Sequence, residues 1–101
     1  MRQPPDVELV HLDECPLWRG AATRLRAAMR MVGLDPTHVR YRSVATAATP
    51  ADFPGSPTIL IEGQDPFAGD AAGGPACRRY STERGLDVAP SLAQLVAALS
   101  R

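Results

Sequence analysis

The sequence predicts a small α/β fold, and three features indicate it. Residues 7–12 form a short apolar run rich in β-branched side chains, and prolines bound it at both ends, which favours a strand. Residues 16–32 then repeat apolar side chains at helical spacing. Residues 58–62 form another strand-like run, and an amphipathic segment from residue 91 closes the chain. Alternating strand and helix patterns of this kind predict the α/β class.

The first half of the chain predicts a strand, a helix and a second strand. Pro16 suits the first position of the helix, and Gly33 suits the residue just past its end. Residues 37–44 alternate in polarity, which places Val39 and Tyr41 on one face of a strand and arginines on the other. Residues 45–56 are rich in Ala, Thr and Pro, and we expect a loop with one helical turn there.

The second half predicts two strands and a helix. Residues 58–62 and 76–81 are the expected third and fourth strands, joined as an antiparallel hairpin by a Gly- and Pro-rich loop at 63–75. Cys77 then begins the fourth strand and lies beside the end of the third, away from Pro57. Ser91 and Gln94 have the spacing of a capping box for the last helix. No repeat or linker divides the chain, so residues 1–101 are expected to be one domain.

Composition narrows the class of function. A chain of 101 residues has room for one hydrophobic core. Eleven basic residues balance eleven acidic ones, which argues against binding to nucleic acid or to an anionic membrane. The N-terminus lacks the apolar core of a secretory signal, and no apolar run approaches the ~20 residues of a membrane span. We therefore expect a cytoplasmic protein. Every basic residue is Arg, which indicates GC-rich codon usage and a bacterial source.

The two cysteines are the main candidates for chemistry. In a reducing compartment, widely separated cysteines are more often free or redox-active than bridged. Cys15 lies at the predicted start of the first helix, whose N-terminus favours a thiolate. Asp13 and Glu14 disfavour the thiolate and Arg19 partly offsets them, so the net direction stays open. Neither cysteine has the neighbours of a typical metal-binding motif.

The order of elements, with Cys15-Pro16 opening the first helix and Ser56-Pro57-Thr58 opening the third strand, resembles the thioredoxin fold. The match is to its minimal, glutaredoxin-like form, a β-α-β-β-β-α chain with a four-stranded mixed sheet. This resemblance implies that Cys15 is the nucleophile and that Pro57 is a cis-proline facing it. It implies that Ser56 offers backbone hydrogen bonds to a substrate. The implied substrate-binding set is Pro16, Trp18, Ser56, Pro57 and Thr58.

A narrower resemblance covers most of the chain. Cys15-Pro16 followed by Trp18, residues 53–59, Asp65-Pro66-Phe67 and residues 77–80 are similar to the small bacterial thioredoxin-like proteins of the DF family. Some members of that family carry selenocysteine where Cys15 stands. The biochemical role of the family is not well defined, so this resemblance sharpens the expected fold and site more than the reaction.

The motif departs from thioredoxin because Trp18 stands where a second cysteine would be. A mixed disulfide at Cys15 must then be resolved by an external thiol such as glutathione, or by Cys77. The resulting prediction is a monothiol oxidoreductase with no bound cofactor, acting on a disulfide, a peroxide or other oxidised sulfur. Its expected partners are a small thiol or a protein disulfide.

Two other functions stay open. The first is handling of soft metals or organomercurials, since Asp13, Cys15 and Cys77 match the residue types used by alkylmercury lyases. The second is a non-catalytic thioredoxin-like interaction module, which pairs with another protein or with a second copy of itself as a homodimer. A test of the catalytic prediction is whether Cys15 reacts as a thiolate.

Several residues have a plain structural interpretation. His11 on the first strand is interpreted as a packing residue, and Trp18 as partly buried packing that can also cover a thiol. Cys77 on a strand favours packing, with the resolving role as the alternative. Surface charge solvated by water is the preferred interpretation for three further residues, with cofactor binding as the alternative: Arg78, Arg79 and Arg84.

Overall fold

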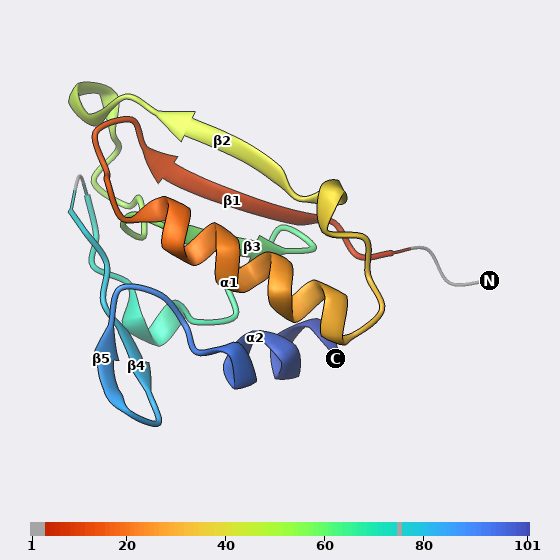
Figure 1. Cartoon of the computed structure of the whole chain (residues 1–101). Helices are drawn as coiled ribbons and strands as arrows, with labels where there is room; N and C mark the ends of the chain where they lie inside the picture. Colours follow the sequence, from red (N-terminus) through yellow and green to blue (C-terminus); the bar gives the residue numbers. More distant parts are fainter. Residues whose placement is uncertain (1–3, 75) are drawn as a thin grey trace.

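The computed structural model describes residues 4–74 and 76–101, and the predicted α/β class is confirmed (Figure 1). Met1–Gln3 and Pro75, the last residue of the predicted loop 63–75, lie outside the described residues. The strands and helices are, in chain order, β1 (Val7–Leu12), α1 (Trp18–Met31), β2 (Arg40–Val44), β3 (Thr58–Ile61), β4 (Tyr80–Thr82), β5 (Gly85–Asp87) and α2 (Leu92–Leu99). Three short 3-10 turns lie between them: η1 (Pro36–His38), η2 (Thr46–Ala48) and η3 (Ala68–Asp70).

The main sheet has three strands in the order β2-β1-β3. β1 runs parallel to β2, and Leu12 pairs with Val44 at the carboxyl end of both strands. β3 is antiparallel to β1, with Val10 opposite Thr58. β1 is central, and five of its six residues are buried, which accounts for its nearly continuous apolar sequence.

Helix α1 connects the two parallel strands and covers one face of the sheet (Figure 1). Ala21, Leu25 and Met29 recur at helical spacing and are buried in the core with Leu9 of β1. The helix begins at Trp18, two residues later than predicted, and its N-cap residue Leu17 makes no side-chain capping bond. Its end agrees with the prediction, since Gly33 has a φ of 80° just past the last turn.

The second strand is shorter than predicted. Asp35 accepts a hydrogen bond from the backbone of Thr37 and caps η1, so β2 begins only at Arg40. Val39, just before it, is buried, whereas Tyr41 is 43% exposed. The helical turn expected within residues 45–56 is present as η2.

The predicted four-stranded sheet is wrong at its fourth strand. Residues 76–81 were expected to pair antiparallel with β3, but β4 starts only at Tyr80 and pairs with β5 in a separate two-stranded sheet. Gly85, with a φ of 100°, opens β5 at this hairpin turn. The earlier residues run parallel to the segment before β3, and Cys77 bridges to Ser56. The local strand pattern did not reveal this change of partner.

The C-terminal helix α2 packs beside α1 on the same side of the main sheet (Figure 1). Its predicted capping box is confirmed: the hydroxyl of Ser91 accepts from the backbone of Gln94, and the Gln94 side chain accepts from the backbone of Ser91. Leu95 and Leu99 are buried in the core. Over the described residues, no helix is both long and apolar enough to cross a membrane.

Candidate functional site

Cys15 lies in the turn that connects β1 to α1. Its backbone N–H donates to the carbonyl of Leu12 at 3.1 Å, which closes the turn at the carboxyl end of the strand. The residue is 6% exposed, and its thiol is free. Cys15 was predicted to cap a helix beginning at Pro16, but α1 begins at Trp18 with Leu17 as its N-cap, so Cys15 lies two residues before the cap. The field of a helix falls off with distance from its end, so it is weaker at Cys15 than predicted.

The acidic pair before Cys15 does not act as one unit. Asp13 is held by η2, since its Oδ1 accepts from the backbone N–H and the hydroxyl of Thr46 at 3.2 and 3.0 Å. Glu14 is exposed to solvent. Two hydrogen bonds therefore hold the Asp13 carboxylate against another part of the chain, whereas the Glu14 carboxylate is left in solvent.

Ser56 joins the Cys15 turn to the rest of the site. Its hydroxyl accepts from the backbone N–H of Leu12 at 3.0 Å, and the residue is fully buried. Its own N–H donates to Ala76 at 2.9 Å, and its carbonyl accepts from Arg78 at 2.8 Å. The expectation that these backbone groups are free to bind a substrate is wrong for this conformation, because residues 76–78 occupy both.

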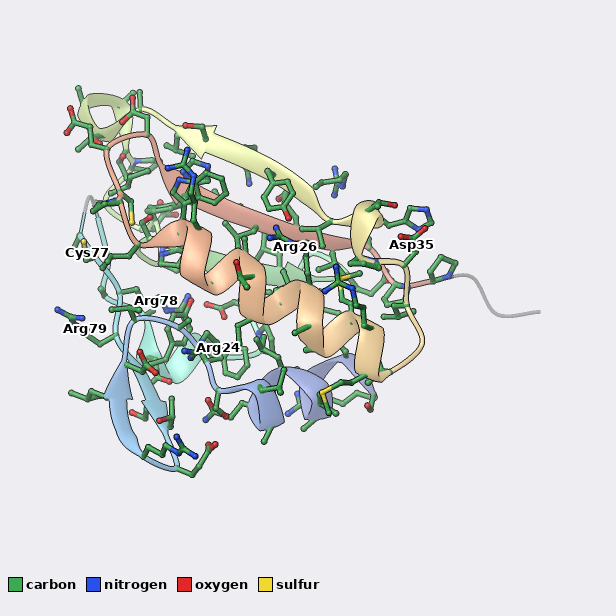
Figure 2. All side chains as sticks on the ribbon, viewed as in Figure 1. Arg24, Arg26, Asp35, Cys77, Arg78 and Arg79 are labelled. Carbon is green, nitrogen blue, oxygen red and sulfur yellow. The ribbon has the colours of Figure 1, made fainter. Side chains whose placement is uncertain are left out.

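Cys77 lies between the two residues that bond to Ser56. It is exposed and free, and Figure 2 places it on the loop segment above the β4–β5 hairpin. The predicted position beside the far end of β3, away from Pro57, is therefore wrong. The parallel bridge with Ser56 instead brings the backbone of Cys77 next to the Ser56–Pro57 peptide. That peptide bond is cis, as predicted.

Arg78 is buried with no exposed surface, so the interpretation as a solvated charge is wrong for this residue. Its Nη1 donates to Asp65 Oδ2 at 2.7 Å and to Thr58 Oγ1 at 3.2 Å, and its Nη2 donates to the Phe67 carbonyl. Figure 2 shows Arg79 pointing outward beside it, and Arg79 and Arg84 are exposed. Within the described residues, Arg78 Nε is the single buried side-chain N or O atom without a partner.

Tyr80 links the arginine to the peptide at Pro57. Its hydroxyl donates to the Pro57 carbonyl, and its ring lies 4.5 Å from the Arg78 guanidinium carbon. Burial raises the pKa of Tyr80 well above its ordinary value, and Arg78 opposes part of that rise. The phenol therefore remains a hydrogen-bond donor at neutral pH.

An aromatic group lies on the helix side of the Cys15 turn. The His11 ring stacks on Trp18 with centroids 4.3 Å apart and planes 8° apart. Trp18 also contacts Tyr41 and lies under the guanidinium of Arg19 at 5.1 Å. Trp18 packs against the core while remaining partly exposed, in agreement with its structural interpretation.

The predicted site residues divide into an exposed and a buried part. Pro16 and Cys77 are exposed and Trp18 is partly so, whereas the relative exposure of Ser56, Pro57 and Thr58 is below 2%. Hydrogen bonds connect the segments of Cys15, Ser56 and Cys77 at one end of the main sheet. Among the predicted site residues, direct contact with solvent is therefore made by Pro16, Trp18 and Cys77.

The three residues proposed to hold a soft metal do not form a ligand set. Across residues 4–74 and 76–101, no three His, Cys, Asp or Glu side chains lie close enough together to hold a metal ion. Asp13 points to Thr46, as its hydrogen bonds require. The geometry gives the metal-handling hypothesis no support.

An open cavity of about 960 Å³ lies at the opposite end of the sheet. It is lined by Pro5, which precedes β1, by Ile61 at the end of β3, and by Val32 and Leu99 from the helix ends. None of the predicted site residues lines it. No pattern in the sequence pointed to this cavity, because its walls come from the ends of separate elements.

Sequence reasoning missed Leu12 and Asp65 as site residues. Leu12 acts through its backbone, bonding to Ser56 and Cys15, which no side-chain pattern reveals. Asp65 stands in the Asp65-Pro66-Phe67 motif noted in the sequence, but its partner Arg78 is 13 positions away. Comparisons with protein-family models, curated proteins and solved structures gave no match. The case for a function therefore depends on the geometry of this site.

Proposed function

We propose that this chain is a thioredoxin-like thiol oxidoreductase with Cys15 as its nucleophile. One observation carries the proposal: Leu12 bonds to both the Cys15 turn and Ser56, and Ser56 bonds to the segment of Cys77. Both thiol-bearing segments therefore meet at one end of the main sheet. The strand order β2-β1-β3, with two parallel strands, one antiparallel strand and both helices on one face, supports a thioredoxin-like core. The departure is at β4, which pairs outside this sheet.

The proposed reaction is disulfide exchange. The thiolate sulfur of Cys15 attacks one sulfur of a disulfide R–S–S–R′, forms a Cys15–S–S–R bond and releases R′–S⁻, which takes up a proton. A small thiol such as glutathione, as its thiolate, then attacks the sulfur of R and releases the Cys15 thiolate. In the alternative route Cys77 attacks Cys15, releases R–S⁻ and leaves a Cys15–Cys77 disulfide for external thiols to reduce.

The site favours a small disulfide over an extended peptide as substrate. A peptide is aligned by backbone hydrogen bonds, and both backbone groups of Ser56 already bond to residues 76–78. Among the predicted site residues, Pro16, Trp18 and Cys77 offer exposed contact area, and Glu14, next to Cys15, adds an exposed carboxylate. We place this activity in a reducing compartment such as the cytoplasm, where thiols are kept reduced.

The test is the pH dependence of alkylation at Cys15. Iodoacetamide is reacted with the Cys77→Ser protein, folded and urea-unfolded, and the Cys15 peptide is followed by mass spectrometry. Because limited access slows the folded protein at every pH, the informative quantity is the rate at pH 6.5 divided by the rate at pH 9.5. We expect this ratio to be at least about threefold higher in the folded protein, since a nucleophilic cysteine must be thiolate near neutral pH.

The Cys15→Ser protein, alkylated at Cys77, is the matched control and should give the same ratio folded and unfolded. A ratio for Cys15 equal to or below the unfolded value would refute the nucleophile. Reduction of a small disulfide such as oxidised glutathione by the wild type, lost in Cys15→Ser, completes the test. If Cys77→Ser keeps that activity, the mixed disulfide at Cys15 is resolved by the external thiol and not by Cys77.

A second candidate function is a non-catalytic interaction module, and the exposed edge of β2 favours it. β2 borders the main sheet on one side, and four of its five residues are exposed. An open strand edge can pair with another chain, including a second copy. Analytical sedimentation that detects a dimer of both the wild type and Cys15→Ser would favour this function, provided that the wild type shows no disulfide-reducing activity.

A further inference from the structure

Helix α1 contains four arginines and no acidic residue, although acidic and basic residues balance over the whole chain. Three of them, Arg19, Arg26 and Arg30, follow one another at spacings of seven and four residues, which places them on one face of the helix. Arg24 lies off this face and pairs with Asp87. Among the described residues, no ion pair includes any of the other three. This face therefore carries three positive charges without counterions.

The arrangement of these charges does not stabilise the helix. Arg26 and Arg30 are four residues apart, and like charges at that spacing repel each other. Arg19 lies in the first turn, where the helix dipole disfavours a cation, and no acidic residue is present there. Acidic residues mixed among the basic ones would keep the surface soluble and add favourable pairs. Local chemistry that works against its own element is expected at a functional surface.

Two aromatic side chains border the three arginines. Tyr41 of β2 is 43% exposed, and its hydroxyl accepts from Arg26 Nη1 at 2.9 Å, on the side of α1 toward β2 (Figure 2). Trp18 contacts Tyr41 and lies under the guanidinium of Arg19. Trp, Tyr and Arg are the residue types most enriched among those that dominate binding energy in protein interfaces. We call the whole set the arginine face: Trp18, Arg19, Arg26, Arg30 and Tyr41.

The surroundings of the arginine face favour an acidic polypeptide as its partner. A second copy of the chain, bound through the same face about a twofold axis, would set arginines against arginines. Glu14 before α1 and Asp35 after it are exposed, so a long polyanion that extends past both ends of the helix meets carboxylates. Beside the face, no strand among the described residues pairs with the outer edge of β2. Open backbone groups of this kind pair with polypeptide.

We propose that the arginine face binds an extended acidic segment of another protein, whose carboxylates pair with the three arginines while its backbone lies along the edge of β2. Guanidinium groups bind carboxylates through paired hydrogen bonds, and Tyr41 supplies contact area. From Arg19 to Arg30 the helix rises about 16 Å, the length of about five residues of extended chain. This binding does not depend on disulfide exchange at Cys15, and it gives the interaction module a partner of defined chemistry.

The test is the affinity for a fluorescein-labelled peptide of alternating Glu and Thr residues, measured by fluorescence anisotropy. Arg26→Glu is the informative variant, because it reverses a charge in the middle of the face and gives the helix a favourable pair with Arg30. We expect the dissociation constant to rise at least about tenfold, because attraction becomes repulsion, with no fall in melting temperature. Arg84→Glu makes the same charge change on the β4–β5 hairpin and should alter the constant less than about twofold.

Three results would overturn the proposal. The first is absence of peptide binding at millimolar concentration. The second is an equal loss in Arg26→Glu and Arg84→Glu, which would mean attraction to net charge alone. The third is tighter binding of a single-stranded oligothymidylate, which would assign the face to nucleic acid. If Arg26→Glu does not fold, Arg30→Gln, which removes a repulsion, must weaken binding at least about threefold.

NMR locates the bound peptide on the protein. The chain has a single tryptophan, so its spectrum contains one indole N–H signal, that of Trp18. We expect this signal to shift when the Glu-Thr peptide binds, since Trp18 borders the arginine face. An indole signal that stays in place at saturating peptide would put the binding elsewhere on the surface and refute the assignment.

The assays for the proposed functions fail separately from this one. Peptide binding by a protein that reduces no disulfide supports the arginine face and refutes only the role of Cys15. Disulfide reduction by a protein that binds no acidic peptide refutes the arginine face alone. A dimer that binds no acidic peptide likewise refutes this face and keeps the interaction module with a second copy as its partner.

Discussion

Arg78 carries its charge inside the protein, where the cost of losing a partner is large. Its side chain has no exposed surface, and Asp65, its ion-pair partner at 2.7 Å, is 12% exposed. A buried charge without its counterion keeps the desolvation cost and loses the attraction that offset it. The pair also joins the segment after β3 to the residue beside Cys77. Its integrity therefore affects both stability and the position of that thiol.

We predict that Asp65→Asn lowers the free energy of unfolding by about 3 to 5 kcal/mol, because it leaves the Arg78 charge buried and unpaired. Urea denaturation followed by circular dichroism measures the change. Asp6→Asn is the matched control: its partner Arg40 is 60% exposed, and we expect a loss below about 1 kcal/mol. A loss below about 1 kcal/mol for Asp65→Asn as well would contradict a structural role for the pair.

The burial of Arg78 also explains why the site was only partly predictable. An arginine between Cys77 and Arg79 has no local signal of burial, because its partners are Asp65, Thr58 and the Phe67 carbonyl. Cys15 and Ser56, by contrast, were found from motifs next to strand and helix boundaries. Residues that act locally can be predicted from the sequence, whereas those that depend on a distant partner cannot.

At the scale of elements, α1 contains one residue that works against its helix. Gly20 lies in the first turns, and a Cβ built there meets no atom within 4 Å. A glycine inside a helix costs backbone entropy that alanine does not. Gly33, just past the end of the same helix, is equally open but has a φ of 80° that favours glycine.

These two positions give opposite predictions for one substitution. Gly20→Ala should raise the free energy of unfolding by about 0.5 to 1 kcal/mol. Gly33→Ala should lower it by about 1 kcal/mol or more, since alanine is strained at positive φ. Thermal denaturation of both variants measures this, and a stabilising Gly33→Ala would contradict the αL ending of α1. Neither variant should change the alkylation of Cys15.

The elements that the sequence predicted correctly are those whose signals come from residues close together in the chain. The apolar period of α1, the continuous apolar run of β1 and the Ser91–Gln94 box each depend on residues within a few positions. The start of α1 was placed too early because Pro16 suits a first turn, whereas Cys15 instead closes a turn onto Leu12. The partner of β4 was wrong because pairing across a long loop depends on register, which the strand pattern does not contain.

At the scale of the whole molecule, the main sheet and the β4–β5 hairpin are held in different ways. β1 is hydrogen-bonded on both sides and packed against the helices. The hairpin is connected to the rest by side chains: Gln94 donates to the Ser81 carbonyl at 2.7 Å, and Arg24 donates to Asp87 at 3.2 Å. Figure 2 shows Arg24 between α1 and the hairpin. The exception is Tyr80 of β4, which is fully buried and donates to the Pro57 carbonyl, whereas the contacts of Gln94 and Arg24 can break without opening the core.

We therefore predict two levels of amide protection in native-state hydrogen exchange. The paired amides of β1 should exchange only through global unfolding, whereas those of β4 and β5 should exchange through local opening at lower free energy. Arg24→Gln should speed exchange in β5, because it removes the ion pair with Asp87, and leave β1 unchanged. Equal protection in both regions would mean that Tyr80, whose hydroxyl bonds to Pro57, ties the hairpin to the core strongly enough to make them one cooperative unit. Movement of Cys77, which directly precedes Arg78 and this hairpin, would then also require global unfolding.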